Sequence, residues 1–200
     1  MRDLEQLSEY LASLPGLGPR QARRIAYFLI TEKTNLSGKL VKTLAEARQN
    51  RRYCVFCQAL FFDQGEHCRT CRDQSRDRSV LMLVENDIDK ESIEKTGAYK
   101  GMYFIIGGSA PVTESDLSAT KLRLAKMEEI LKRSDRLPEI ILGFNYTPQG
   151  EHTAELLSRY LKKQFSDSIK ISHLGRGLST GTELEYSDAD TFRHALDNRK

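Results

Sequence analysis

Four short apolar runs divide the chain from residue 80 onward. Each has the length of a strand, and they occupy residues 80–84, 103–106, 140–144 and, more weakly, 169–172. Between the later runs, apolar residues recur every three or four positions, as on one face of a helix. These stripes are Leu124, Met127, Leu131 and Ala154, Leu157, Leu161. Strands that alternate with helices predict an α/β fold with a mainly parallel sheet flanked by helices.

The first fifty residues show a helical pattern instead. Leucines recur at helical spacing from Leu4 to Leu14, and Pro15 ends this first helix. A second helix is expected to begin at Pro19, because proline suits the first helical turn. Its apolar positions share one face and are Ala22, Ile25, Ala26 and Leu29. A third helical stretch covers residues 38–50, so the pattern predicts a small helical module built around a glycine-containing hairpin.

Charge is unevenly distributed along the 200 residues, although the formal net charge is only +3. Residues 1–53 carry ten Lys and Arg against five Asp and Glu, whereas residues 54–200 carry 21 against 23. A basic module in front of a near-neutral body indicates a polyanion partner at the N-terminal end. A few solvated arginines without a partner are the alternative.

The apolar runs are also informative about the compartment. None approaches the roughly 20 residues that a membrane-spanning helix needs, so we expect no transmembrane segment and no membrane partner. The first five residues are mostly charged and unlike a secretion signal, which favours the reducing cytoplasm.

All four cysteines of the chain lie in two Cys-x-x-Cys pairs, Cys54 with Cys57 and Cys68 with Cys71. Two such turns present four thiolates, as a closed tetrahedral zinc site requires, with sulfur about 2.3 Å from the metal. Two disulfides would conflict with a reducing compartment, and a single redox pair explains only half of the cysteines. We therefore expect one structural Zn²⁺ per chain and no open position for catalysis, with His67 a solvated neighbour.

The hairpin between the first two helices has features of a phosphate-binding site. Gly16 and Gly18 let the backbone approach a phosphate, and the free N–H groups of the second helix face that anion. Arg20 and Arg24 share a helix face and are candidates for adjacent phosphates, while Arg23 points elsewhere. This Gly-Leu-Gly-Pro hairpin resembles the helix-hairpin-helix motif of non-sequence-specific DNA-binding proteins. The alternative is a helical hairpin whose glycines merely form a turn.

Polar residues follow the expected strands at their carboxyl ends, where function collects in parallel sheets. The first strand leads into Glu85 and Asp89, and the third leads into Asn145 and Thr147, then Glu151. A strand ending in glutamate, a glycine-ended strand and a third strand followed by x-Gly-Glu resemble the Toprim domain. Catalytic Toprim domains hold magnesium on carboxylates, whereas Asn145 and Thr147 are neutral and leave a weak site. The acids Glu85, Asp87, Asp89 and Glu151 are therefore expected to form a surface for a protein partner, and the alternative is that they gather around one ion.

The order of these parts resembles the RecR family of bacterial recombination mediators over nearly the whole chain. The parts are residues 1–53, a helix-hairpin-helix module; residues 54–72, a four-cysteine zinc finger; residues 79–175, a Toprim domain; and residues 176–200, a C-terminal arm and helix. The string Leu184-Glu185-Tyr186 in the arm also matches the family. Departures include Ser179, where the family usually has proline, and Gln149, where it usually has glutamate.

The resemblance implies a DNA-binding recombination mediator that is not an enzyme. RecR-like proteins form ring-shaped tetramers that encircle DNA and act with RecO and RecF to load recombinase on gapped DNA. It implies that Arg20 and Arg24 face the DNA, and that Glu85 with Asp89 lie in an acidic, RecO-facing region. The alternative is a metal-dependent Toprim enzyme that cleaves or primes DNA.

Overall fold

The computed structural model divides the chain into two compact units, Met1–Arg51 and Arg52–Lys200. The residues that it describes are 2–113, 117, 120–133, 139–165, 168–175, 177–178, 181, 183, 185 and 188–197. Leu184, Tyr186 and Ser179, which the sequence singled out in the C-terminal arm, lie outside the described residues.

Three helices make the first unit: α1 (Arg2–Ala12), α2 (Pro19–Thr31) and α3 (Leu36–Asn50). Helix α2 begins at Pro19, as its sequence predicts, and packs against α1. Ala22 and Ala26 are fully buried on α2, since small side chains on its inner face permit close approach. The predicted helix, hairpin and helix are thus confirmed.

The turn between α2 and α3 is organised by one carboxylate. Glu32 accepts hydrogen bonds from the backbone amides and hydroxyl groups of both Thr34 and Ser37, at 2.6–3.1 Å. These donors, the Ser37 amide first, lower the pKa of Glu32 from 4.5 to about 2. The carboxylate thereby satisfies amide groups at the start of α3, which intrahelical bonds leave free.

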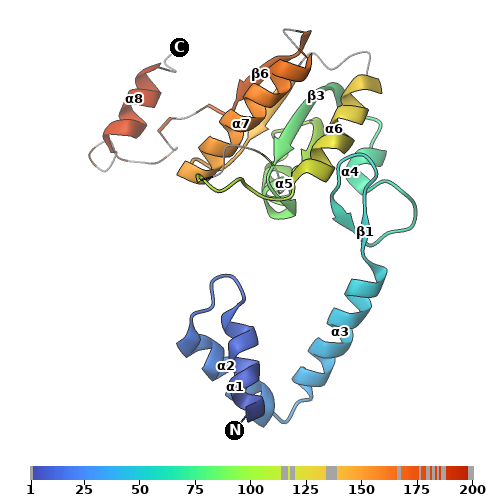
Figure 1. Cartoon of the computed structure of the whole chain (residues 1–200), viewed down its shortest axis with the longest axis vertical. Coiled ribbons are helices and arrows are strands. Elements are labelled where there is room, and N and C mark those ends of the chain that lie inside the picture. Colours follow the sequence, from blue (N-terminus) through green and yellow to red (C-terminus); the bar gives the residue numbers. More distant parts are fainter. Residues whose placement is uncertain are drawn as a thin grey trace. The chain divides into compact units, whose positions relative to one another are not determined.

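The second unit contains a four-stranded parallel sheet (Figure 1). Its strand order is β4 (Gly101–Ile105), β3 (Asp77–Val84), β5 (Glu139–Gly143) and β6 (Lys170–His173). These strands coincide with the four apolar runs, and the predicted parallel sheet is confirmed. All five residues of β4 and the last four of β3 are buried, because helices cover both faces of such a sheet.

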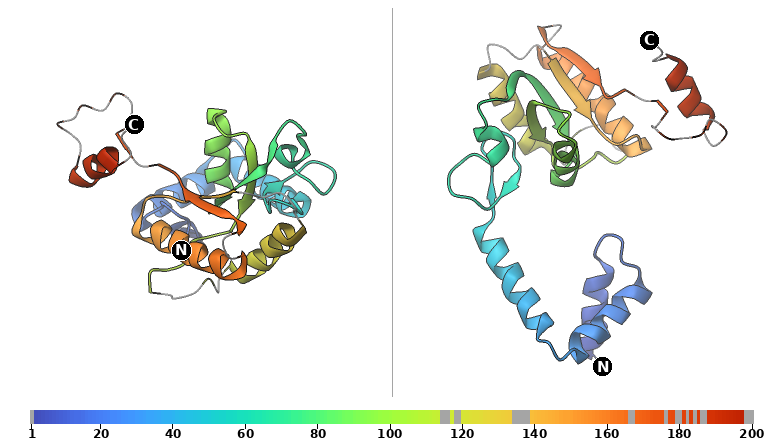
Figure 2. Two further views of the ribbon diagram at one scale, coloured as in Figure 1. Left: turned by 90° about the horizontal axis from the view of Figure 1, so that it is seen from above. Right: turned by 180° about the vertical axis from the view of Figure 1, so that it is seen from behind.

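The crossover helices lie on opposite faces of this sheet. Helix α5 (Asp87–Thr96) covers one face, whereas α6 (Lys121–Arg133) and α7 (Pro148–Phe165) lie side by side on the other (Figure 2). This arrangement follows from right-handed crossovers, since the chain reverses its direction across the sheet after β4. Leu124, Met127 and Leu131 are buried on α6, as their spacing predicts.

A small metal-binding segment precedes the sheet in the same unit. It consists of a two-stranded antiparallel ribbon, β1 (Arg52–Tyr53) with β2 (Leu60–Phe61), and the short helix α4 (Arg69–Arg72). A final helix, α8 (Ala189–Asp197), follows the sheet. Within the described ranges, none of the helices is long and apolar enough to cross a lipid bilayer.

Candidate metal centre and phosphate-binding hairpin

The four cysteines converge on one point inside the second unit. Their relative exposures are 0–5%, and their sulfur atoms all lie within 4.8 Å of one another. The Sγ atoms of Cys57 and Cys68 are 3.5 Å apart, far beyond a disulfide bond length of about 2.05 Å. Four thiolates at about 2.3 Å from a common ion lie roughly 3.8 Å apart, so the donor set fits tetrahedral Zn²⁺. The predicted metal cluster is confirmed as a structural arrangement.

Tight turns position each pair of cysteines. In the first knuckle, Cys54 donates its backbone N–H to Ala59 O at 2.9 Å, and Gln58 donates to Cys54 O at 3.0 Å. Gln58 adopts a left-handed conformation, with φ 60°, to reverse the chain. In the second knuckle, Cys68 is the N-cap of α4, and its carbonyl accepts from Arg72. Both turns therefore aim their sulfur atoms at the same interior point.

The cysteine thiols differ in the direction in which their pKa values are shifted. Hydrogen bonds from Cys57, then Cys68 and Cys71, lower the pKa of Cys54 far below its usual value. The pKa of Cys71 is raised, because its thiol hydrogen-bonds to Cys54, Cys57 and Cys68 and is buried. The cluster thus stabilises a thiolate in an apolar surrounding, and a Zn²⁺ ion held by Cys54, Cys57, Cys68 and Cys71 would deprotonate the other thiols and fold the segment.

The metal-binding segment contacts strand β4 and the helices α5 and α6. Ile105, at the end of β4, donates its amide to Cys57 O at 2.9 Å. The amide of Leu60 donates to Asp87 Oδ1 at 2.8 Å. The guanidinium of Arg123 lies 5.9 Å from the ring centroid of Tyr53 and donates to Ile105 O at 3.1 Å. Sequence reasoning missed these roles, since no local pattern around Ile105 or Arg123 signals them.

Asp87 consequently has a role different from that of its acidic neighbours. Its carboxylate binds the β2 backbone, and it does not join Glu85 and Asp89 in a cation site. Glu85 is half-buried, and its carbonyl accepts from the amides of Gly107 and Gly108 at 2.8 and 3.1 Å. Asp89 is also half-buried, and its Oδ2 atom has no hydrogen-bond partner among the described residues.

The acids of the Toprim-like sheet do not form a metal cluster in the part of the chain that the structure describes. There, the four cysteines are the sole group of three or more His, Cys, Asp or Glu side chains close enough to share an ion. Asn145 and Glu151 line a separate pocket of about 190 Å³ at the carboxyl end of β5, together with His173. The alternative that Glu85, Asp87, Asp89 and Glu151 gather around one ion therefore finds no geometric support among the described residues.

The hairpin glycines of the first unit have open space around them. Gly16 has φ +79°, a conformation that side chains disfavour, and a Cβ at Gly16 or Gly18 would meet no atom within 4 Å. Gly18 is the N-cap of α2 with no side-chain cap, so the first amides of that helix face outward. Arg20 and Arg24 are exposed one turn apart, whereas Arg23 lines a cavity against α1.

Comparison with known proteins identifies relatives of nearly the same length. Residues 4–48 match the RecR helix-hairpin-helix family, and residues 79–175 match the Toprim domain family. The chain is 36% identical over 201 residues to the Recombination protein RecR of Bifidobacterium adolescentis, covering 98% of this chain and 95% of that protein. Proteins of the same name from Pelodictyon phaeoclathratiforme and Rubrobacter xylanophilus are 34% and 35% identical, and they cover 98% and 100% of this chain. The alignments span 95% and 96% of those two proteins.

Proposed function

The chain belongs to the RecR family of recombination proteins, and we propose that it is a non-enzymatic, DNA-binding mediator of recombinational DNA repair. In this proposal, residues 1–53 bind DNA, residues 54–72 hold zinc, and residues 79–175 bind RecO and RecF, with Glu85 and Asp89 at the RecO surface. Residues 176–200 help to join four chains into a ring around gapped DNA in the bacterial cytoplasm, at the nucleoid, where the complex loads recombinase.

The hairpin carries the DNA-binding part of the proposal. Its open glycines leave room for a phosphate next to the backbone, and the start of α2 supplies amide donors and a positive dipole end. Arg20 and Arg24 stand in the first two turns, where they repel the helix dipole unless they serve an anion. Because all these groups recognise phosphate and none is a base-reading constellation, the binding is sequence-independent.

The Toprim-like sheet supports a role without catalysis. Phosphoryl chemistry needs carboxylates that gather around Mg²⁺. Here the carboxylate of Asp87 accepts a hydrogen bond from the amide of Leu60, and the neutral residues Asn145 and Thr147 follow β5. The remaining acids are available for a protein partner instead.

Exposed apolar side chains support the assembly of several chains. On α3, Leu40, Val41 and Leu44 share one face and are 50%, 70% and 62% exposed. Tyr27, Phe28 and Ile30 of α2 are also about half exposed. A contiguous apolar stripe on a helix is typical of an interface, because its exposure to water is costly. We propose that these faces of the first unit contact other copies of the chain.

The test of DNA binding is the dependence of affinity on salt. Arg20→Ala and Arg24→Ala are each expected to weaken binding to gapped duplexes of any sequence and to lower the salt slope by about 1. Lys126→Ala, which removes one exposed positive charge from α6, is the control and should keep the slope. An unchanged slope in both arginine variants would exclude this hairpin from the phosphate contacts.

The enzymatic alternative has its own test. If the chain were a metal-dependent Toprim enzyme, Mg²⁺ would support nicking or primer synthesis, and Glu85→Gln would abolish it. We expect neither reaction with the intact protein. Magnesium-dependent turnover that Glu85→Gln removes would refute the non-enzymatic role.

A further inference from the structure

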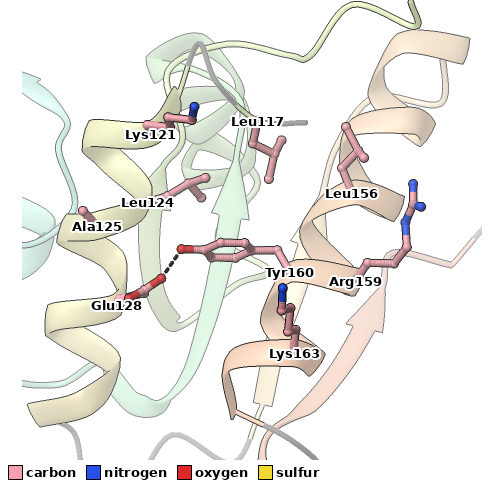
Figure 3. Close-up of a pocket in the computed structure, with 9 residues that line it drawn as sticks. All are labelled: Leu117, Lys121, Leu124, Ala125, Glu128, Leu156, Arg159, Tyr160 and Lys163. Atoms are coloured by element: carbon pink, nitrogen blue, oxygen red, sulfur yellow. Dashed lines mark hydrogen bonds between the residues drawn. The ribbon is translucent and has the colours of Figure 1, made fainter. Parts of the chain in front are cut away.

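A groove of about 390 Å³ runs between α6 and α7, on the sheet face that these two helices cover (Figure 3). Each helix contributes four lining residues with the same spacing, at positions 0, 3, 4 and 7. These residues are Lys121, Leu124, Ala125 and Glu128 on α6 and Leu156, Arg159, Tyr160 and Lys163 on α7. Leu117 completes the lining. Matched spacing on two neighbouring helices gives the groove two continuous walls.

The floor of the groove is apolar and firmly held. Leu124 and Leu156 are 3% and 6% exposed, and both belong to the hydrophobic core beneath the sheet helices. Leu117 is buried as well, at 8%. The floor is therefore a fixed part of the core, against which an apolar side chain of a ligand gains burial without rearrangement.

In the part of the chain that the structure describes, the exposed charged side chains that line the groove are positive. Lys121, Arg159 and Lys163 are all exposed at the rim and come from both helices. Arg159 forms an ion pair with the exposed Glu155 at 3.8 Å, which holds it weakly. Among the residues that the structure describes, neither lysine lies within ion-pair distance of a carboxylate.

Among the described residues that line the groove, one carboxylate occurs, that of Glu128, and its charge is neutralised locally. Glu128 accepts a hydrogen bond from the hydroxyl of Tyr160, which reaches across from α7 (Figure 3), and it also pairs with Lys132 at 3.3 Å. The Tyr160 bond and Lys132 lower the pKa of Glu128, so the carboxylate stays ionised and occupied. Its charge does not offset the cations at the rim.

We propose that this groove binds a short acidic segment of a partner protein, whose apolar side chains enter the floor while its carboxylates face Lys121, Arg159 and Lys163. Charge complementarity selects an anion, and the aliphatic floor selects a side chain rather than a sugar-phosphate. Single-stranded nucleic acid fits less well, because it requires open aromatic faces for base stacking. Tyr160 is the one aromatic residue among the described lining residues, and its hydrogen bond to Glu128 holds it across the groove. The site is separate from the hairpin, so it does not depend on the DNA-binding proposal.

The test uses three fluorescein-labelled synthetic peptides of equal length with the intact protein. The first consists of Asp and Glu with two leucines, the second has serine in place of leucine, and the third has Asn and Gln in place of the acids. We expect the first to bind best at low salt, as measured by fluorescence anisotropy. If the second peptide bound as well as the first, charge attraction alone would explain the binding. If the third bound as well as the first, the groove would be a plain apolar cavity. Either result would refute the proposal.

Variants of the rim and floor provide the second arm. Ala125→Trp fills the groove from an exposed position and is expected to weaken binding of the first peptide at least about tenfold by steric exclusion. Lys163→Glu and Lys121→Glu should each weaken binding of the same peptide about three- to fivefold. Lys126→Glu and Lys162→Glu are matched controls, since both are exposed on the same helices outside the groove. Thermal melting verifies that every variant is folded.

The outcomes separate the possible occupants. Failure of the first peptide to bind, or equal losses in the control variants, would overturn the proposal. The proposal would also be overturned if labelled single-stranded DNA competed with the peptide and Ala125→Trp weakened the binding of that DNA. The groove would then be a nucleic-acid site. Selective loss in Ala125→Trp and the two rim variants, with DNA binding unchanged, is the result that we expect.

Discussion

The amide of Ile105 donates a hydrogen bond of 2.9 Å to the carbonyl oxygen of Cys57, which joins the edge strand β4 to the first zinc knuckle. The outward side of an edge strand has unpaired amides that must be satisfied or shielded. Here the metal-binding segment covers one of them, and Cys57 itself belongs to the same buried cluster as the core of the sheet. A metal ion held by the four cysteines would therefore stabilise the packing of the sheet as well as its own loop.

Removing the metal is expected to loosen this junction. Because folding of a four-cysteine segment depends on metal binding, chelation or Cys68→Ser should lower the melting temperature and speed hydrogen exchange at the Ile105 amide. Freshly purified, reduced protein should contain one zinc per chain. His67→Ala is the control, since His67 is exposed and should leave the zinc content unchanged. A Cys68→Ser variant that stays folded and assembled but loses DNA binding would instead indicate direct contact with DNA.

Asp87→Ala tests the attachment of the metal-binding segment to helix α5. Loss of its bond to the Leu60 amide is expected to reduce the free energy of unfolding by about 1 kcal/mol, because one acceptor disappears. Hydrogen exchange at Leu60 should speed up. Asp87→Asn retains an acceptor oxygen and should recover most of the loss, and Glu91→Ala, exposed on the same helix, should change nothing. Equal stability of Asp87→Ala and wild type would contradict this role.

Two glycine substitutions separate the shape of the hairpin from its contacts. Gly16→Ala places a side chain at φ +79° and is expected to destabilise the first unit by about 1 kcal/mol. Gly18→Ser occupies open space at the N-cap of α2, where serine is a favoured residue, so stability should be kept or raised. If a phosphate approaches the backbone there, Gly18→Ser should nevertheless weaken DNA binding. Unchanged DNA affinity in this variant would show that the glycine serves the turn alone.

Glu32 should make the α2–α3 turn sensitive to acid. Its pKa in the folded chain, about 2, lies below the ordinary value of 4.5, so its contribution is complete above pH 4.5. That contribution is expected to decline as the pH falls from about 4.5 to 2. Hydrogen exchange of the Thr34 and Ser37 amides, followed by NMR against pH, measures this decline. Glu32→Gln should be insensitive to pH in that range, and a wild-type turn that is equally insensitive would refute the assignment.

The apolar face of α3 gives a test of assembly. Val41→Asp combined with Leu44→Asp places charges in the proposed contact between chains, where burial of an unpaired charge is costly. Light scattering should then show a smaller particle than the tetramer that we propose for the wild type. Thr43→Asp, exposed elsewhere on the same helix, is the matched control and should keep the wild-type mass. A double variant of undiminished mass would place the interface elsewhere.

Several features of this protein were determined by the sequence alone. The four strands and the helices α6 and α7 follow from apolar runs and helical stripes, because burial on a sheet or a helix face imposes a fixed period. Helix α5 was not predicted from the sequence. The cysteine quartet follows from the chemistry and spacing of its ligands, which a short segment can supply by itself. Pro19 likewise predicts the start of α2 through its local geometry.

Only the tertiary structure decided which residues meet across the chain. In the sequence, Asp87 is one of several neighbouring acids, yet in the structure it binds the amide of Leu60. Arg123 of α6 contacts Tyr53 in β1 and Ile105 in β4. The groove between α6 and α7 exists because two separate helices lie side by side on one sheet face. Such contacts depend on the order of strands and the angles of packing, which local periodicity does not encode. The sequence therefore predicted the elements and the metal ligands, while packing determined how they are joined.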